Sequence, residues 1–592
     1  MINPRGTRRR LAITILAVFA IVAVFVIRLV DIQVVRAAEL TDEASQRRTG
    51  TVTTYGVRGS ILDANGVVLA DSVERFNITA APNNFDKALK LGTTWMRKDG
   101  ELVKVPVAEA VEAVANAIDE KSADLYSTLT ADPSSSFVYL TKSVTLKVFK
   151  KVRDLNIGWI YSELNPARTY PSGSIAGNLV GYVGTEGAQA GVELTSNSCL
   201  AATNGKSTFE SSRDGVRMPG STIVQTQAKD GGDVELTIDA DLQWYAQQAL
   251  AEQGTALGAE WATATVVEVK TGRMVVAADW PYIDPNDRST FDSFGGGSRL
   301  FAAPFEPGSI IKVATFAALL NAGKITPSTP VTVPGRYTDG LPAGASIKDA
   351  WAHDTINLTA TGVLMNSSNI GTAILGTNLT KQQRHDALTS FGFNKKTEVG
   401  FNGESSGIVK PVDQTDAITA VTQEFGQGMS ATSAQVASMY QTLGNGGVRM
   451  PLTLVDGCRQ ADGTLTDQPS PTGTRVVSEY AANTTVQMME TVASQGSLKN
   501  VLTIPGYRVA AKTGTAQVAE NGRYGSDRIV SVAGLVPAEN PEYAIVVTFA
   551  KPDTMKTSAA AAPTFNAIMK QVIKTFRITP STTPAPSLPL TW

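Results

Sequence analysis

Histidine and cysteine are scarce in this 592-residue sequence, which has two of each. The histidines, His353 and His385, are not spaced as metal ligands, and a Ser-His-Asp hydrolase would have to use one of them. Packing or surface roles are therefore expected for both. The cysteines, Cys199 and Cys458, form no Cys-x-x-Cys pair, which argues against a zinc site. They could form one disulfide outside the cytoplasm, and two unpaired thiols are an equal alternative.

An excess of one charge sign is also missing. Lys and Arg together number 52 and Asp and Glu 54, so the net charge is −2, which argues against a nucleic-acid-binding surface as the main function. A length of 592 residues and a hydrophobic fraction of 43% instead predict two or more domains with sizeable cores. No internal repeat is evident in the sequence.

One long apolar run is present, near the N-terminus. Four arginines lie among the first ten residues, and residues 11–27 then carry no charge. As a helix these residues cover about 25 Å, and the apolar residues beyond Arg28, which can snorkel, extend the span. The basic flank predicts a cytoplasmic tail at residues 1–10, a single-pass anchor at residues 11–30 and an extracytoplasmic remainder.

A cleaved signal peptide is the alternative explanation of this run. Val35-Arg36-Ala37 is a poor cleavage site, the apolar run is longer than a usual signal core, and Arg28 and Asp31 intervene before the site. We therefore expect an uncleaved anchor and no second span.

The rest of the chain divides into two expected domains and a tail. Residues 31–233 predict a strand-rich extracytoplasmic region, with helices near residues 107–118 and 146–155. The boundary is expected just before an alternating strand that leads into a helix. Residues 234–577 mix β-rich and helical stretches, and residues 578–592, rich in Pro, Ser and Thr, predict a disordered tail.

A serine directly after Pro307-Gly308 opens an apolar run that predicts a helix closed by Gly323. Helix positions i and i+3 share a face, so Ser309 and Lys312 can meet. A lysine buried in such a run is costly to keep charged, so its pKa falls and it can take the serine proton. Alone, however, Ser-x-x-Lys is common, and a helix N-cap serine is the favoured interpretation.

Two further motifs change this assessment. Ser-x-Asn occurs at residues 367–369, and Lys-Thr-Gly occurs at residues 512–514. Each is weak alone, because Ser-x-Asn is usually a loop or a cap and Lys-Thr-Gly is usually a turn. Together, in this order and within one α/β region, they form the motif set of penicillin-binding proteins and class A β-lactamases.

The chain resembles a class B penicillin-binding protein, a membrane-anchored peptidoglycan D,D-transpeptidase, nearly end to end. Phe425-Gly426-Gln427-Gly428 resembles a stretch of the transpeptidase domain, and residues 28–33 are most like the FtsI-type cell-division branch. The residues that resemble the pedestal and junction motifs of the class are Arg58, Gly59, Asp63, Asn65, Gly66, Gly191, Glu193, Leu194 and residues 236–239.

The resemblance implies a fold of three parts. These are an α/β (α+β) transpeptidase domain with an antiparallel sheet flanked by helices at residues 234–577, a strand-rich pedestal of the dimerisation type at residues 31–233, and one transmembrane helix. It implies peptidoglycan stem peptides as substrates, with a D-Ala-D-Ala donor and an amine acceptor, and β-lactams as ligands. An FtsW-type glycan polymerase and other divisome membrane proteins are the implied partners, at the division septum. No metal, organic cofactor or nucleic acid is expected.

The resemblance also implies roles for the residues of the first two motifs. Ser309 would attack the carbonyl between the two terminal D-alanines, and Lys312 would take its proton. Ser367 would relay a proton toward the departing D-alanine. Asn369 would hold Lys312 and the substrate amide.

The third motif is implied to bind the substrate carboxylate. Lys512 would supply positive charge near that carboxylate, and Thr513, Gly514 and Thr515 would bind it. The backbone N–H groups of Ser309 and Thr515 would form the oxyanion hole.

Other proteins share part of this pattern. An elongation-type class B transpeptidase has the same chemistry. A β-lactamase has the three motifs, but it needs neither an anchor nor the long region before the catalytic domain, and no group that would activate its water can be identified. A β-lactam sensor would carry more membrane spans. A non-catalytic division scaffold would not need Ser309, Lys312, Asn369 and Lys512 together.

A second Lys-Thr-Gly, at residues 270–272, precedes the candidate nucleophile. Alternating β runs on both sides of it are typical of a hairpin. We therefore expect a surface turn there, outside the active site, whereas Lys512 lies within a long β-rich run.

Overall fold

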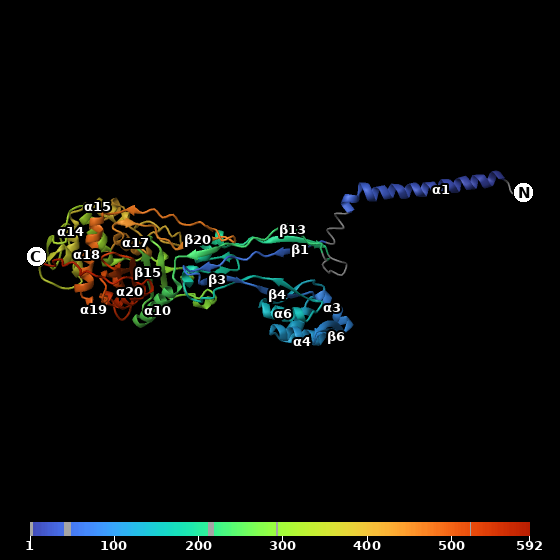
Figure 1. Cartoon of the computed structure of the whole chain (residues 1–592), viewed down its shortest axis with the longest axis horizontal. Helices are drawn as coiled ribbons and strands as arrows, with labels where there is room; N and C mark the ends of the chain where they lie inside the picture. Colours follow the sequence, from blue (N-terminus) through green and yellow to red (C-terminus); the bar gives the residue numbers. More distant parts are fainter. Residues whose placement is uncertain (1–3, 41–48, 211–217, 219, 292–293, 521–522) are drawn as a thin grey trace. The chain divides into compact units, whose positions relative to one another are not determined.

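The computed structural model describes residues 4–40, 49–210, 218, 220–291, 294–520 and 523–592 (Figure 1). The chain forms two compact units. The first comprises Met1–Val57 and Ala202–Asp230, and the second comprises Arg58–Ala201 and Gly231–Trp592. The region expected as a pedestal, residues 31–233, is thus divided between the two units.

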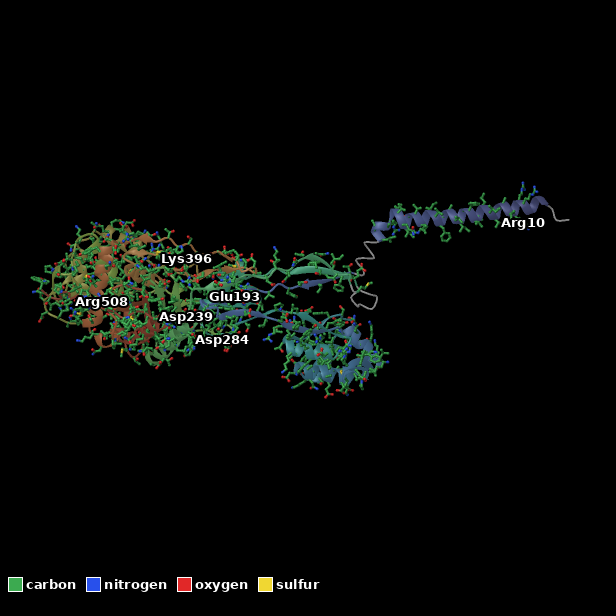
Figure 2. The ribbon with its side chains drawn as sticks, viewed as in Figure 1. Arg10, Glu193, Asp239, Asp284, Lys396 and Arg508 are labelled. Carbon is green, nitrogen blue, oxygen red and sulfur yellow. A yellow bond between two sulfur atoms is a disulfide. The ribbon has the colours of Figure 1, made fainter. Side chains whose placement is uncertain are left out.

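The first unit begins with α1 (Pro4–Val30), a helix of 27 residues. It is about 40 Å long, which exceeds the roughly 30 Å thickness of a bilayer's hydrocarbon core. Its side chains project on all sides, with Arg10 near the N-terminal end (Figure 2), and residues 8–30 are all exposed. A helix that is apolar all round needs lipid or other helices around it. The helix includes the predicted anchor, and residues 1–3 of the predicted cytoplasmic tail lie outside the described residues.

A three-stranded antiparallel sheet also belongs to the first unit. Its central strand, β12 (Gly205–Glu210), pairs with β1 (Thr49–Thr54) on one side and with β13 (Ile223–Thr226) on the other. Four of the six residues of β1 are threonines, which suit a pleated strand. The sheet therefore joins chain segments that lie far apart in sequence.

Within the second unit, residues 75–164 form a lobe with its own core. β4 (Arg75–Ala80) lies between β7 (Val138–Thr145) and β8 (Ile160–Leu164). Phe85 and Trp159 are among the largest side chains of the core. The lobe also contains α3 (Pro82–Leu91), α4 (Val107–Ile118), α5 (Ser122–Thr130), α6 (Leu146–Asp154) and the hairpin of β5 (Thr93–Lys98) with β6 (Glu101–Pro106). The helices predicted near residues 107–118 and 146–155 are confirmed.

Strands from both sides of the expected domain boundary share one six-stranded sheet of order β21-β20-β14-β2-β3-β9. β14 (Asp233–Leu236) pairs in parallel with β2 (Ile61–Leu62) and antiparallel with β20 (Val455–Arg459). Cys199 and Cys458 form a disulfide with their Cα atoms 5.9 Å apart, which decides between the two alternatives left open by the sequence. The remaining strands are β3 (Val68–Val73), β9 (Ala167–Thr169) and β21 (Leu465–Thr466).

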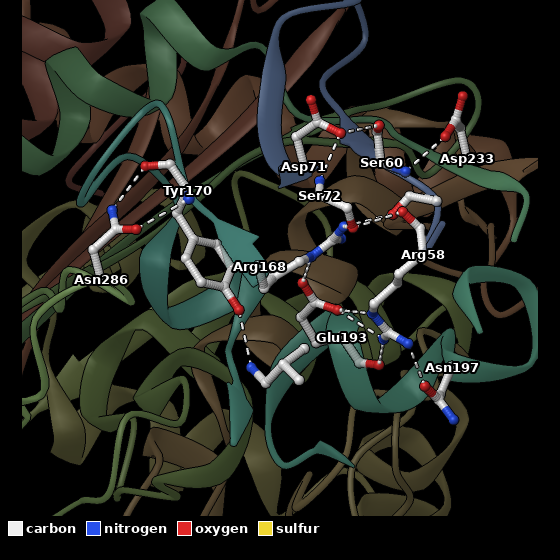
Figure 3. Close-up of polar contacts among 12 residues, drawn as sticks. Arg58, Ser60, Asp71, Ser72, Arg168, Tyr170, Glu193, Asn197, Asp233 and Asn286 are labelled. Atoms are coloured by element: carbon white, nitrogen blue, oxygen red, sulfur yellow. Dashed lines mark hydrogen bonds and ion pairs between the residues drawn. The ribbon is translucent and has the colours of Figure 1, made fainter. Parts of the chain in front are cut away.

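A buried ion-pair cluster centred on Glu193 lies beside this sheet (Figure 3). The Glu193 carboxylate is fully buried and lies 2.7 Å from Arg58 Nη2 and 2.6 Å from Arg168 Nε. Arg58 also donates to Asn197 Oδ1, and Arg168 donates to the carbonyl of Gly59. Because one carboxylate compensates two guanidinium groups away from water, the cluster fixes how three chain segments meet.

A five-stranded antiparallel sheet of order β16-β15-β25-β24-β23 forms the centre of the C-terminal domain. Every residue of its middle strand, β25 (Tyr543–Ala550), is buried, because helices cover both faces. Ile545 and Val547 belong to one core cluster, and Ala544 and Val546 to the other, as alternating strand residues must. The other strands are β15 (Trp261–Glu268), β16 (Met274–Trp280), β23 (Ala510–Glu520) and β24 (Arg523–Val536).

The two faces of this sheet have different helices. α10 (Ala240–Leu257) and α20 (Ala562–Thr575) contribute to one core cluster. The other cluster includes α12 (Lys312–Asn321), α17 (Ser433–Gly444) and α18 (Glu479–Gln495). The expected antiparallel sheet flanked by helices is therefore confirmed.

Residues 578–592 are ordered, whereas their composition predicts disorder. Ser581 N–H donates to the Gly506 carbonyl at 2.9 Å, and Thr359 N–H donates to the Leu590 carbonyl at 3.0 Å. The segment needs no core of its own, because it makes backbone hydrogen bonds to a domain that is already folded.

The Glu193 cluster leads to a prediction about stability. Glu193→Ala leaves two guanidinium groups, on side chains that are only 17% and 6% exposed, without a counter-charge, so it should lower the free energy of unfolding by roughly 3–5 kcal/mol. Glu235→Ala is the matched control, because its Arg459 partner is 43% exposed and should lose much less. Thermal unfolding of the purified variants would measure both, and equal losses would contradict the central role of Glu193.

Candidate active site

Ser309 lies in a short 3₁₀ turn, Gly308–Ile311, and the α-helix itself begins at Lys312. The sequence predicts one continuous helix from Ser309, and the first turn is tighter than predicted. In a 3₁₀ turn, as in an α-helix, side chains at i and i+3 lie on the same side. Gly308 has φ +61°, and a Cβ atom there would lie 3.0 Å from the Thr515 carbonyl oxygen. Glycine is therefore required where this turn meets β23.

Lys312, three residues after the serine, is fully buried. Its Nζ donates to Asn369 Oδ1 at 2.8 Å and to Ser367 Oγ at 3.3 Å, and it also contacts the Ser367 carbonyl. Burial, and then the nearby charge of Lys512, hold the pKa of Lys312 well below its usual value. A lysine whose pKa is lowered in this way gives up its proton more readily than a solvated lysine, so it can act as a base.

The Ser-x-Asn motif spans the junction of two short helices. α13 (Ala360–Asn366) ends at Ser367, which has the left-handed φ of +58°, and α14 (Asn369–Gly376) begins two residues later. Such a backbone conformation is uncommon for serine, and its cost must be met by the surrounding contacts. It places the Ser367 hydroxyl within reach of both buried lysines.

The Asp349 carboxylate binds the junction between α13 and α14. No motif in the sequence identifies Asp349. It accepts hydrogen bonds from the Ser368 hydroxyl at 2.6 Å, from Ile370 N–H at 3.0 Å and from Asn369 N–H. His353 Nε2 lies 3.0 Å from the same carboxylate. His353 thus has the packing role expected from its spacing.

Lys512 is fully buried on β23, an edge strand of the central sheet. Its Nζ donates to Ser367 Oγ at 2.8 Å and to the Thr513 carbonyl at 3.0 Å. Burial lowers the pKa of Lys512 to about 7. Both lysines therefore meet at one hydroxyl, and both are far easier to deprotonate than a solvated lysine.

The rest of the Lys-Thr-Gly motif runs beside the serine turn. A Cβ atom on Gly514 would lie 2.8 Å from Ile310 Cγ2 and 3.2 Å from the Pro307 carbonyl oxygen, so the strand and the turn are in direct contact. Thr513 is half-buried, and Thr515 is exposed and accepts from Ser558 N–H at 3.2 Å. An edge strand with free backbone groups next to a serine can bind an extended peptide.

The loop that contains Phe425 and Gly426 supports the turn from its other side. Gly308 N–H donates to the Gly426 carbonyl at 2.9 Å, and the Phe425 ring lies 5.9 Å from Lys312 Nζ. A Cβ atom on Gly426 would come within 2.2 Å of the Gly308 carbonyl oxygen, so glycine is required here too. The stretch noted at residues 425–428 thus borders the candidate nucleophile.

The second Lys-Thr-Gly, at residues 270–272, is a turn between β15 and β16. Thr271 Oγ1 donates to Glu268 Oε2 at 2.5 Å, and Gly272 has φ +79°. Lys270 is exposed. This copy is a surface hairpin turn, as its sequence context predicts.

Ser309, Lys312, Ser367, Asn369 and Lys512 therefore come from three chain regions and form one site. Hydrogen bonds connect the last four, and Ser309 stands three residues before Lys312, in the turn that contacts β23. Among the residues that the structure describes, no group of three or more His, Cys, Asp or Glu side chains is placed to hold a metal ion. The chemistry available is a serine hydroxyl and, three residues on, a buried lysine whose pKa is lowered, which suits acyl transfer.

Both regions of the chain match models of known protein families. A model of the penicillin-binding protein transpeptidase domain matches residues 262–570, which include all three motifs. A model of the penicillin-binding protein dimerisation domain matches residues 53–236.

Individual proteins are similar over nearly the whole chain. Penicillin-binding protein PbpB of Mycolicibacterium smegmatis is 33% identical over 598 residues, which cover 97% of this chain and 91% of that protein. Peptidoglycan D,D-transpeptidase FtsI of Escherichia coli K12 is 31% identical over 561 residues, which cover 93% and 89%. The crystal structure of penicillin-binding protein 3 from Mycobacterium tuberculosis with aztreonam has 27% identity and a TM-score of 0.68, and it aligns over 91% of this chain and 100% of that one.

The lengths of these matches exclude a shared motif or a single shared domain as the explanation. With the geometry of the three motifs, they show that this chain belongs to the class B penicillin-binding proteins, which are peptidoglycan D,D-transpeptidases.

Proposed function

We propose that this transpeptidase cross-links septal peptidoglycan through an acyl-enzyme formed on Ser309. The observation that supports the proposal most is the burial of Lys312 and Lys512 at a single hydroxyl, that of Ser367. This arrangement supplies a lysine with a lowered pKa as the base, without using either histidine.

In the acylation step, Ser309 Oγ attacks the carbonyl carbon between the two terminal D-alanines, and its proton passes to Lys312. The bond to the terminal D-alanine then breaks, and Ser367 passes its proton to the departing amine while it takes the proton held by Lys312. The backbone N–H groups of Ser309 and Thr515 would stabilise the oxyanion by roughly 3–4 kcal/mol per donor. The products are an ester on Ser309 and free D-alanine.

In the second step, the amine of another stem peptide attacks this ester. A new peptide bond forms, the proton of the amine returns to Ser309, and the enzyme is regenerated. Lys512, Thr513 and Thr515 bind the carboxylate of the donor peptide, and Asn369 holds its amide. Gly514 keeps the strand close enough to the serine turn for these contacts.

A role in division, rather than elongation, is supported by the likeness to FtsI of E. coli and by the FtsI-like residues 28–33. The N-terminus lies in the cytoplasm and the catalytic domain outside, because basic residues crowd the first flank of α1. The disulfide supports the same placement, since disulfides persist in oxidising compartments. The exposed apolar surface of α1 suits an FtsW-type glycan polymerase as partner.

The catalytic pair can be tested by covalent labelling with fluorescent penicillin. Ser309→Ala should abolish labelling while the fold stays intact, because only a hydroxyl is lost. Lys312→Ala should nearly abolish it, because the serine loses its base. In the unchanged protein, the labelling rate should fall on acidification through the lowered pKa of Lys312, as the amine becomes charged. An adduct mapped by mass spectrometry to another serine would refute the assignment.

The two Lys-Thr-Gly copies provide a matched pair of variants. Lys512→Ala removes a charged hydrogen bond at the site, so it should slow acylation by penicillin about tenfold to a hundredfold. Lys270→Ala removes an exposed turn residue and should change the rate by less than about twofold. Second-order acylation rate constants decide the contrast. A larger loss in Lys270→Ala would mean that the wrong copy has been assigned.

Topology and division role can be tested with one fusion. A green fluorescent protein fused before Met1, of a kind that matures in the cytoplasm and not after export, should fluoresce at the division septum. Fluorescence along the side wall would instead favour the elongation alternative. A fusion of full length that stays dark would contradict the cytoplasmic N-terminus.

A further inference from the structure

The last fifteen residues of the chain, 578–592, contact two of the three elements that form the active site. The first half of this segment lies against the start of β23, which carries Lys512. The second half lies against the start of α13, which ends at Ser367. Neither set of contacts involves a residue of the three motifs.

The contacts of the first half surround Arg508, two residues before β23 begins. Arg508 N–H donates to Ser581 Oγ at 2.8 Å, and its Nη1 donates to Thr583 Oγ1 at 3.1 Å. Tyr507 Oη donates to the Ile578 carbonyl at 2.9 Å. Arg508 is itself held by Glu490 of α18 at 2.7 Å, so this end of the segment is attached to a rigid part of the domain.

The contacts of the second half surround Thr359, the N-cap of α13. Thr359 N–H donates to the Leu590 carbonyl at 3.0 Å, and its hydroxyl donates to the Pro589 carbonyl at 2.5 Å. The same hydroxyl accepts from Gly362 N–H at 3.0 Å. A Cβ atom on Gly362 would lie 2.0 Å from the Leu590 carbonyl oxygen, so the segment and the helix are in direct contact.

These contacts satisfy the backbone at the N-terminus of α13. Helix N-termini leave several N–H groups without partners inside the helix. Ala360 and Thr361 donate to the carbonyls of Thr329 and Pro327, and Gly362 donates to the cap. The C-terminal segment supplies the acceptor for Thr359 N–H. Leu358 and Thr591 form a β-bridge that extends the same attachment.

The short helix α13 connects the attached segment to the active site, because it ends at Ser367. α13 has seven residues, of which Ala360–Leu364 are buried, and it ends directly at Ser367. The Ser367 hydroxyl must stay 2.8 Å from Lys512 Nζ on β23. A shift of α13 along its axis would change that distance directly, because no flexible residue lies between the helix and Ser367.

We propose that residues 578–592 are a positioning element for the transpeptidase site, which holds α13 and β23 in the register that lets Ser367 meet Lys512. Thr359 is the positioning residue through which the segment acts on α13. The inference rests on the roles proposed above for Ser367 and Lys512.

The first test removes residues 588–592 from the full-length protein. Misplacement of a catalytic group by about 1 Å can cost about a hundredfold, so penicillin acylation should slow about tenfold to a hundredfold. The loss should lie in the first-order acylation step and not in the dissociation constant of the non-covalent complex. The fraction of protein that is finally labelled should stay the same.

The second test keeps the segment and changes its contact on α13. Thr359→Val removes the hydroxyl that reaches the Pro589 carbonyl and caps the helix, and it should slow the same step. Thr359→Ser keeps the hydroxyl and should restore the rate. Thr380→Val is the matched control, since Thr380 caps α15 (Lys381–Ser390) in the same domain, on the surface and outside the site.

Two outcomes would overturn the inference. One is that the truncated protein and the separate Thr359→Val variant both acylate at the full rate. The other is a loss in the labelled fraction while the labelled molecules react at the full rate, because that result indicates partial unfolding and not misplacement. Ser367→Ala separates the two proposals. If Ser367→Ala slows acylation and the truncation does not, only the positioning role fails; if Ser367→Ala has no effect, the proposed mechanism fails.

Discussion

The active site depends on two lysines that are buried at one hydroxyl. Lys312 and Lys512 are both fully buried, and each donates to Ser367 Oγ. Burial lowers the pKa values of both lysines, and the nearby charge of Lys512 lowers that of Lys312 further. Lys312 can therefore serve as the base for Ser309 in a chain that has only two histidines. The same geometry makes the site sensitive to any displacement of α12, α13 or β23.

Much of the C-terminal domain therefore serves to hold these elements in place. Asp349 fixes the junction between α13 and α14, and the loop at Gly426 supports the turn that contains Ser309. Glycine is required at positions 308 and 426, where φ is positive and backbones approach closely, and at position 514 a side chain would press against Ile310. The C-terminal segment adds contacts to both α13 and β23. The catalytic groups are thus supported by residues that never touch a substrate, which is how enzymes keep such groups pre-organised.

Other interactions hold the second unit together near the domain boundary, away from the active site. Glu193 compensates two buried arginines, strands from both sides of the domain boundary share a sheet, and the disulfide joins Cys199 to Cys458. None of these contacts reaches the active site. They instead determine how β2, β3 and β9 meet the domain that carries Ser309. A buried charge cluster at this place provides a defined arrangement of segments and not stability alone.

Local patterns in the sequence determined a large part of the fold and of the candidate site. The spacing of Ser309 and Lys312, the long β-rich run around Lys512, the hairpin at residues 270–272 and the apolar N-terminal run all depend on neighbours within a few residues. The tertiary structure alone decided the role of Asp349, the Glu193 cluster, the disulfide and the attachment of residues 578–592. These contacts join residues far apart in the chain, and composition cannot indicate which backbone carbonyl a distant N–H will meet. The tail illustrates the reason, since a segment with too few apolar residues to fold alone becomes ordered when a folded domain supplies its hydrogen-bond partners.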